Sequence, residues 1–157
     1  MTATIDIDNQ STSSHCPEID SCARWIEQSL KTLGRNSAYD LCLRFVDAEE
    51  SAALNLQYRN KQGATNVLSF PSEAADDIIE QIGYYPLGDI VICPNIVETE
   101  AREQGKQLMD HWAHLVIHGL LHLCGLDHQE EAQAEAMENL EIEILKTLGI
   151  ANPYLIG

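Results

Sequence analysis

The chain has 157 residues and a formal net charge of −16, with nine Lys and Arg against 25 Asp and Glu. Hydrophobic residues make up 45% and charged residues 22%, which is typical of a folded globular protein, and we expect a single domain over residues 1–157. The acidic balance disfavours a simple nucleic-acid-binding module, because it repels phosphates unless the few cations are gathered at one place. It counts less against an enzyme that acts on a short segment or is brought to its substrate by another protein.

The composition also predicts where the protein acts. No apolar run approaches the roughly 18 residues of a membrane helix, so we expect no membrane partner. The first ten residues, MTATIDIDNQ, lack the basic start and the apolar stretch of a secretory signal. Five cysteines without a CxxC pair argue against a disulfide framework and fit a reducing compartment. We therefore expect a cytoplasmic protein.

In chain order, the apolar spacing predicts alternating strands and helices. Residues 3–8 (ATIDID) have the period of two that is typical of a strand, and a turn-rich loop follows them. Apolar residues then recur at helical spacing from about residue 18 to 33, where Gly34 ends the run. The later predicted elements are strands at 39–46, 66–71 and 87–93 and helices at about 48–58, 94–104, 108–124 and 129–148. This order predicts an α+β fold, a small mixed sheet of about four strands packed with five to six helices.

Two segments of the second half carry more specific expectations. The acidic stretch 72–86 is irregular, which predicts a mobile loop rather than part of the core. In the last helix, an apolar stripe predicts the side that faces the core. Its members are Ala136, Leu140, Ile144 and Leu148.

The histidines predict a metal site. Five of the six lie between residues 111 and 128, in HWAHLVIHGLLHLCGLDH. His118 and His122 are four residues apart, so on a helix both rings project from one face and can bind one ion. Gly125 can end the helix with a positive φ and return His128 as a third ligand. Three nitrogen ligands with an open fourth position are typical of catalytic zinc, although nickel or copper would also be accepted. We therefore predict a zinc site at the end of this long helix.

Two neighbours of the predicted ligands are candidates to orient them. Metal-bound histidines usually donate their free N–H to a partner. His114 lies four residues before His118 on the same helix face, and Asp127 directly precedes His128. Both also have an ordinary structural interpretation, as a packing histidine and as a turn aspartate.

The histidine spacing matches that of metzincin proteases with one difference. Those enzymes carry a general-base Glu directly after the first histidine, and this chain has Gly119 there. Without that carboxylate, zinc peptidase chemistry lacks its proton acceptor. We therefore do not expect a protease.

A second polar cluster lies upstream, in residues 54–71. Arg59 and Lys61 precede a tight turn that is followed by Thr65 and Asn66. Arginine can bind phosphate through two hydrogen bonds and can stabilise charge on a phosphoryl oxygen. Taken alone, Arg59 is explained better as a solvated surface charge.

Three segments of the chain together resemble the YbeY endoribonuclease family. They are YRNKQGATNVLSFP at 58–71, LGDIVIC at 87–93 and HWAHLVIHGLLHLCGLDH at 111–128, and the resemblance covers roughly residues 39–155. It implies a bacterial, single-strand-specific, metal-dependent endoribonuclease that acts in maturation of the 16S ribosomal RNA 3′ end and in ribosome quality control. It also implies one zinc ion on His118, His122 and His128, Arg59 as the functional arginine, and the ribosome or ribosomal proteins as partners.

The expected chemistry is metal-assisted cleavage of a phosphodiester bond. Arg59 would stabilise charge on the phosphate, and Lys61, Thr65 and Asn66 are candidate RNA contacts. The attacking group, water or the ribose 2′-OH, stays open, and so does the proton acceptor.

Three proton acceptors and two other functions are compatible with the residues. The acceptors are zinc hydroxide, Asp127 and His114. One alternative function is a non-catalytic ribosome-maturation factor with a structural metal, which the acidic charge favours. The other is a metallohydrolase of peptides or small molecules, which Gly119 disfavours.

Overall fold

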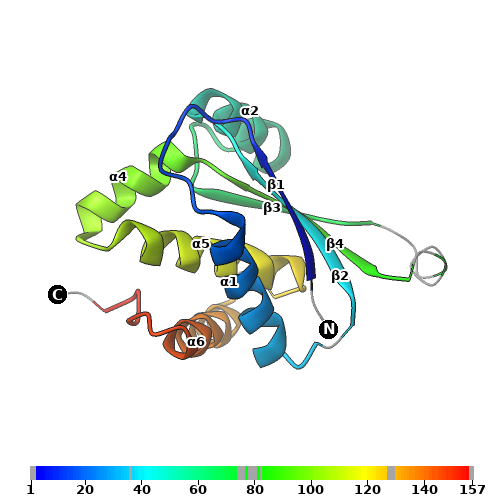
Figure 1. Ribbon diagram of the computed structural model, residues 1–157. Helices are drawn as coiled ribbons and strands as arrows, with labels where there is room; N and C mark the ends of the chain where they lie inside the picture. The colour runs from blue at the N-terminus through cyan, green and yellow to red at the C-terminus, as the bar shows by residue number, and fades with distance from the viewer. Residues whose placement is uncertain are drawn as a thin grey trace.

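The computed structural model describes residues 3–35, 37–73, 77, 81, 83–126 and 130–155. Four strands form one mixed sheet in the order β1-β2-β4-β3 (Figure 1). The strands are β1 (Ala3–Asn9), β2 (Tyr39–Phe45), β3 (Val67–Pro71) and β4 (Tyr85–Ile92). β1 pairs with β2 and β2 with β4 in parallel, whereas β3 is antiparallel to β4. The four predicted strands are confirmed, although β4 begins inside the segment that was expected to be a loop.

The described helices are α1 (Ile19–Thr32), α2 (Ala48–Arg59), α4 (Pro94–Gln104), α5 (Leu108–Leu123) and α6 (Glu131–Thr147). They confirm the predicted α+β fold. Figure 1 shows α1, α5 and α6 on one side of the sheet and α2 on the other. α4 begins with Pro94 in its first turn, where the missing N–H has no helical partner to lose.

The main hydrophobic core lies between the sheet and α5. Side chains of β2 alternate between buried and partly exposed along the strand, and Phe45 meets the fully buried Trp112 edge-on with 5.0 Å between ring centroids. α5 is buried on nearly every side, so it forms the centre of the helical layer. Neither α5 nor any other helix in the described ranges is long and apolar enough to cross a membrane.

The buried side of α6 differs from the predicted stripe. Ala136 is exposed, so the prediction is wrong there, and Leu140 and Leu148 are only partly buried. The fully buried positions are Met137, Glu141, Ile144 and Leu145. The core-facing side is therefore rotated by about one residue, and a carboxylate occupies a position where an apolar side chain would be expected.

Candidate functional site

A cleft of about 710 Å³ brings the two polar clusters of the sequence together. His118 and His122 reach it from α5, Arg59 from the end of α2, and Thr65 and Asn66 from the loop before β3. These segments meet because α5 packs directly against β3, at the edge of the sheet. A metal-type donor pair and a phosphate-type cation therefore face one space.

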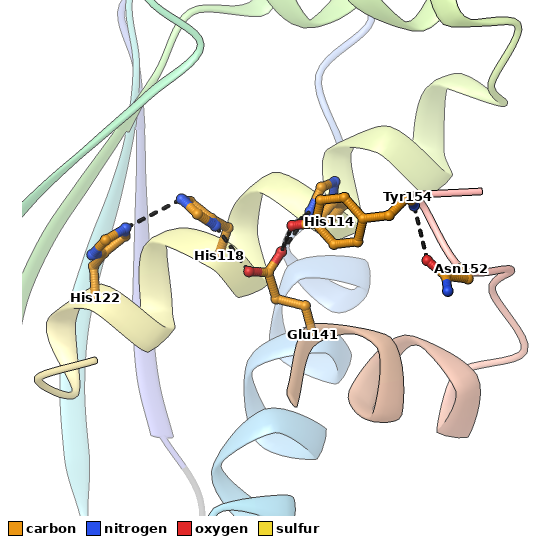
Figure 2. A network of polar contacts seen from close by, with 6 residues as sticks. All are labelled: His114, His118, His122, Glu141, Asn152 and Tyr154. Atoms are coloured by element: carbon orange, nitrogen blue, oxygen red, sulfur yellow. Dashed lines mark hydrogen bonds and ion pairs between the residues drawn. The ribbon is translucent and has the colours of Figure 1, made fainter. Parts of the chain in front are cut away.

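The two histidines are arranged as ligands of a single ion. His118 Nε2 and His122 Nε2 lie 3.2 Å apart (Figure 2). Two nitrogens that bind one zinc ion at about 2.0–2.1 Å with tetrahedral angles lie about 3.3 Å apart, so this donor pair fits zinc. Among the described residues no third side chain completes the group. The predicted third ligand, His128, and the predicted orienting residue, Asp127, lie outside the described residues.

The end of α5 has the geometry that a returning third ligand requires. Gly125 has a φ of +94°, a conformation that suits glycine. The Gly125 N–H donates to the carbonyl of His122, and the Leu126 N–H donates to that of Leu121. These two bonds form a Schellman motif, which turns the chain sharply away from the helix. The helix break predicted at Gly125 is confirmed.

Glu141 of α6 lies directly behind the histidine pair. Its carboxylate is fully buried and accepts three hydrogen bonds. His118 Nδ1 donates to Oε2 at 3.1 Å, His114 Nε2 to Oε1 at 2.6 Å, and the Tyr154 hydroxyl to Oε1 at 2.7 Å (Figure 2). Burial alone would raise the pKa of Glu141, but the hydrogen bonds and charges of His114 and His118 outweigh it and lower the pKa to about 2. Glu141 is therefore an ionised acceptor.

This carboxylate determines which ring nitrogen of His118 carries the proton. An ionised Glu141 can only accept, so His118 Nδ1 must carry the hydrogen. The lone pair of His118 is then on Nε2, the atom that faces His122. This is the tautomer that a metal ligand needs.

His114 does not reach the cleft, although it shares a helix face with His118. Its Nε2 contacts Glu141 and, at 3.1 Å, the Tyr154 hydroxyl. Burial lowers the pKa of His114 and outweighs Glu141, which acts in the opposite direction. The lowered pKa favours the neutral ring. The structure thus places His114 as a support for Glu141.

The candidate RNA contacts fall into two groups. Thr65 and Asn66 line the cleft, whereas Lys61 is exposed and is not among the described lining residues. The Asn66 side-chain amide donates to both Glu100 oxygens, at 3.1 and 3.2 Å, and Glu100 also binds His111 at 3.0 Å. Asn66 is therefore fixed by the protein itself, which leaves fewer of its polar atoms for a ligand.

Two buried polar residues of α2 hold the loop that carries Thr65. The Ser51 hydroxyl donates to the Thr65 carbonyl and accepts from the Thr65 N–H, both at 3.0 Å. The Asn55 amide donates to the Gly63 carbonyl at 2.9 Å. Ser51 and Asn55 are 2% and 5% exposed, so these bonds replace water for the loop backbone.

Replacing Ser51 with Ala is expected to lower the free energy of unfolding by about 1–3 kcal/mol, because both Thr65 backbone groups lose a buried partner. Urea unfolding followed by circular dichroism measures the change. Ser14→Ala, in an exposed loop, is the control and should change the free energy by less than about 0.5 kcal/mol. Equal effects of the two substitutions would contradict a role for Ser51 in holding the loop.

Four residues of this arrangement were missed by reasoning from the sequence. Glu141, Tyr154 and Ser51 lie outside the segments that predicted chemistry, and Asn55 lies inside residues 54–71 but was not singled out there. A signal existed for Glu141, since a charged residue at a core-facing helix position requires hydrogen-bonding partners. Ser51 and Asn55 are likewise polar residues at buried positions of a helix, in α2.

Comparison with known proteins shows which family the chain is similar to. The family model described as Endoribonuclease YbeY matches residues 6–149. Endoribonuclease YbeY of Stenotrophomonas maltophilia K279a is 51% identical over 138 residues, 88% of this chain and 84% of the relative. That of Colwellia psychrerythraea is 45% identical over 157 residues, 99% of each. The solution structure of TM1509 from Thermotoga maritima matches with a TM-score of 0.54 and 26% identity, over 93% of this chain and 92% of that one. The chain belongs to the YbeY endoribonuclease family.

Proposed function

We propose that this protein is a zinc-dependent endoribonuclease that cuts single-stranded RNA in the cleft between α2, β3 and α5. One observation carries the proposal: His118, His122 and Arg59 line the same cleft. Family membership supports the choice of RNA as substrate, since the relatives are named endoribonucleases. The proposal extends to 16S ribosomal RNA 3′-end maturation and ribosome quality control, with ribosomal proteins as partners and the cytoplasm as the location.

His118, His122 and His128 would hold one zinc ion per chain, with other divalent transition metals as alternatives. A bound zinc ion supplies Lewis-acid chemistry for phosphodiester hydrolysis. The described ligand pair favours an imidazole-binding metal over magnesium, which prefers oxygen ligands. Glu141 contacts His118 through Nδ1, which leaves Nε2 for the ion.

Arg59 is the group of this chain best placed to neutralise the scissile phosphate. It ends α2, it is exposed, and it lines the same cleft as His118 and His122. A guanidinium can donate two parallel hydrogen bonds to a phosphate and so stabilise the charge that grows in the transition state.

Two aromatic rings beside Arg59 suit an unpaired base. Tyr58 is 59% exposed and contacts Phe70 edge-on, with 5.0 Å between ring centroids, and both rings line the cleft. Bases stack on aromatic side chains only when they are not enclosed in a duplex. This pair therefore supports a preference for single strands in a protein whose net charge gives little general attraction to RNA.

Geometry reduces the number of candidate proton acceptors, and analysis of the product ends can identify the attacking group. His114 Nε2 contacts Glu141 and Tyr154, and His114 is not among the described residues that line the cleft, so we propose no acceptor role for it. Asp127 and a zinc hydroxide are the remaining candidates. A 2′,3′-cyclic phosphate on the product would identify the ribose 2′-OH as the attacking group, and a 3′-OH with a 5′-phosphate would identify water.

Replacing Arg59 with Glu is expected to reduce kcat/KM for a single-stranded RNA by at least about 100-fold, because the phosphate loses a cation and meets a carboxylate. Cleavage of a labelled RNA by zinc-loaded protein measures the change. Zinc content and melting temperature should stay at the wild-type values, since Arg59 is exposed.

Arg102→Glu is the matched control for Arg59→Glu. It makes the same charge change at an exposed position of α4 that is not among the described residues of the cleft. It should retain the wild-type rate within about threefold, as expected for a distant surface charge screened by salt. Equal activity of the two variants would show that Arg59 has no special role.

A further inference from the structure

Glu141 is unusual among the charged residues of this protein. It is 0% exposed, and no other Asp, Glu, Lys or Arg in the described part of the chain is fully buried. Removing a carboxylate from water is strongly unfavourable unless hydrogen bonds compensate for it. An apolar residue at this position of α6 would pack against the core at no such cost. The buried charge therefore calls for a role that packing does not provide.

We propose that Glu141 is a positioning residue of the zinc site, and that Tyr154 and His114 act through it by fixing its carboxylate. This inference rests on the proposed zinc site. Glu141 would set both the tautomer and the orientation of His118, so that Nε2 is directed at the ion. The C-terminal segment that carries Tyr154 is then part of the support of the metal site.

The carboxylate can orient His118 because both of its oxygens are engaged. Oε2 accepts from His118 Nδ1, while Oε1 accepts from His114 Nε2 and the Tyr154 hydroxyl. Rotating the carboxylate would break the hydrogen bonds of Oε1 to His114 and Tyr154 as well as the bond of Oε2 to His118. Flipping the His118 ring would leave a buried acceptor without its donor, which is unfavourable.

Tyr154 is itself held by its surroundings. Its ring meets the His114 ring at 5.3 Å and 84°, and its N–H donates to the Asn152 side chain at 2.8 Å (Figure 2). A second cavity, of about 200 Å³, borders His118, Glu141 and Tyr154. The ring contact and the hydrogen bonds therefore fix Tyr154 beside this pocket.

The test uses zinc affinity, measured by competition with a chromophoric chelator on the full chain, and not activity. Glu141→Gln keeps an acceptor but removes the charge, and we expect it to weaken zinc binding about tenfold. Glu141→Leu removes the acceptor, and we expect a loss of about 100-fold. Tyr154→Phe keeps the ring and removes one donor, so its loss should be smaller than that of Glu141→Gln.

Two controls separate positioning from a merely structural role. Glu138→Gln makes the same change one turn earlier in α6, on a partly exposed residue that borders the second cavity, and it should bind zinc as the wild type does. In the zinc-free wild type, ¹H–¹⁵N correlation spectra of the imidazoles should show the proton of His118 on Nδ1. A purely structural Glu141 would lower the melting temperature of its variants without changing the tautomer or the zinc affinity.

The possible outcomes are distinguishable. Graded losses of affinity together with the Nδ1–H tautomer support the inference. Wild-type affinity in a folded Glu141→Gln, or an Nε2–H tautomer in the wild type, overturns it and leaves the zinc site intact. If Glu141→Leu fails to fold, Glu141→Gln and the tautomer decide. A wild-type protein that binds no zinc overturns the proposed function, and this inference with it.

Discussion

Replacing His122 with Ala is expected to abolish both zinc binding and RNA cleavage while leaving the protein folded. His122 Nε2 lies 3.2 Å from His118 Nε2, so one side of the proposed ion would lose its ligand. Loss of an outer partner of a metal site already costs about 10–100-fold in affinity, so loss of a direct ligand should cost more than about 100-fold. His122 is only partly buried, and its truncation should therefore cost little stability.

Three samples and one matched control test this prediction. Zinc content by atomic emission and cleavage of a single-stranded RNA resembling the 16S 3′ end are measured for the wild type, His122→Ala and chelator-treated wild type. His15→Ala removes a histidine from an exposed loop and should retain both zinc and activity. Cleavage by all samples would point to a contaminating nuclease. A folded His122→Ala that keeps one zinc ion per chain would refute the ligand assignment.

The elements of this fold could be predicted because their periodicity is a local property. The alternation of Leu41, Leu43 and Phe45 on β2 and the glycine break after α5 are properties of neighbouring residues. The strand order could not be predicted in the same way. The central place of β4, between parallel β2 and antiparallel β3, depends on pairing between segments distant in the chain.

The candidate site was predictable to a similar degree. The spacing of His118 and His122 predicted one shared face of a helix, and these rings do face each other. That Arg59 lines the same cleft was suggested by a family resemblance and not by any pattern near Arg59 itself. Glu141 and Tyr154 come from elements whose local sequence gives no hint of α5, so only the packing of α6 and the C-terminal segment reveals them.

Gly119 explains why the likeness to metzincin spacing does not extend to protease chemistry. A Cβ atom at this position would lie 2.8 Å from Ile90 Cγ2 and 3.2 Å from both Ser69 Oγ and Val67 Cγ2. Ile90 is fully buried, and the Gly119 carbonyl accepts a hydrogen bond from Ser69 at 2.9 Å. The position after His118 therefore faces β3 and β4 at close range, with no room for a larger side chain unless α5 and the sheet move apart. A glutamate there would not fit in the place that the protease base occupies in the matching pattern.

Replacing Gly119 with Glu is accordingly expected to lower the free energy of unfolding by more than about 4 kcal/mol, since overpacking costs about 1–3 kcal/mol and an unpaired buried carboxylate adds about 3–5 kcal/mol. Gly119→Ala should cost less, because the gain of about 1 kcal/mol in helix propensity offsets part of the overpacking.

Thermal and urea unfolding measure both Gly119 substitutions, and Ala136→Glu adds the same carboxylate at an exposed position of α6 as the control. A Gly119→Glu protein as stable as Ala136→Glu would mean that α5 and the sheet can separate enough to admit a side chain. The close contact between α5 and β3 brings the histidines beside the loop that carries Thr65, so such a separation would also move the proposed ligands away from Arg59. The same glycine that excludes a protease base is thus what allows the two halves of the cleft to meet.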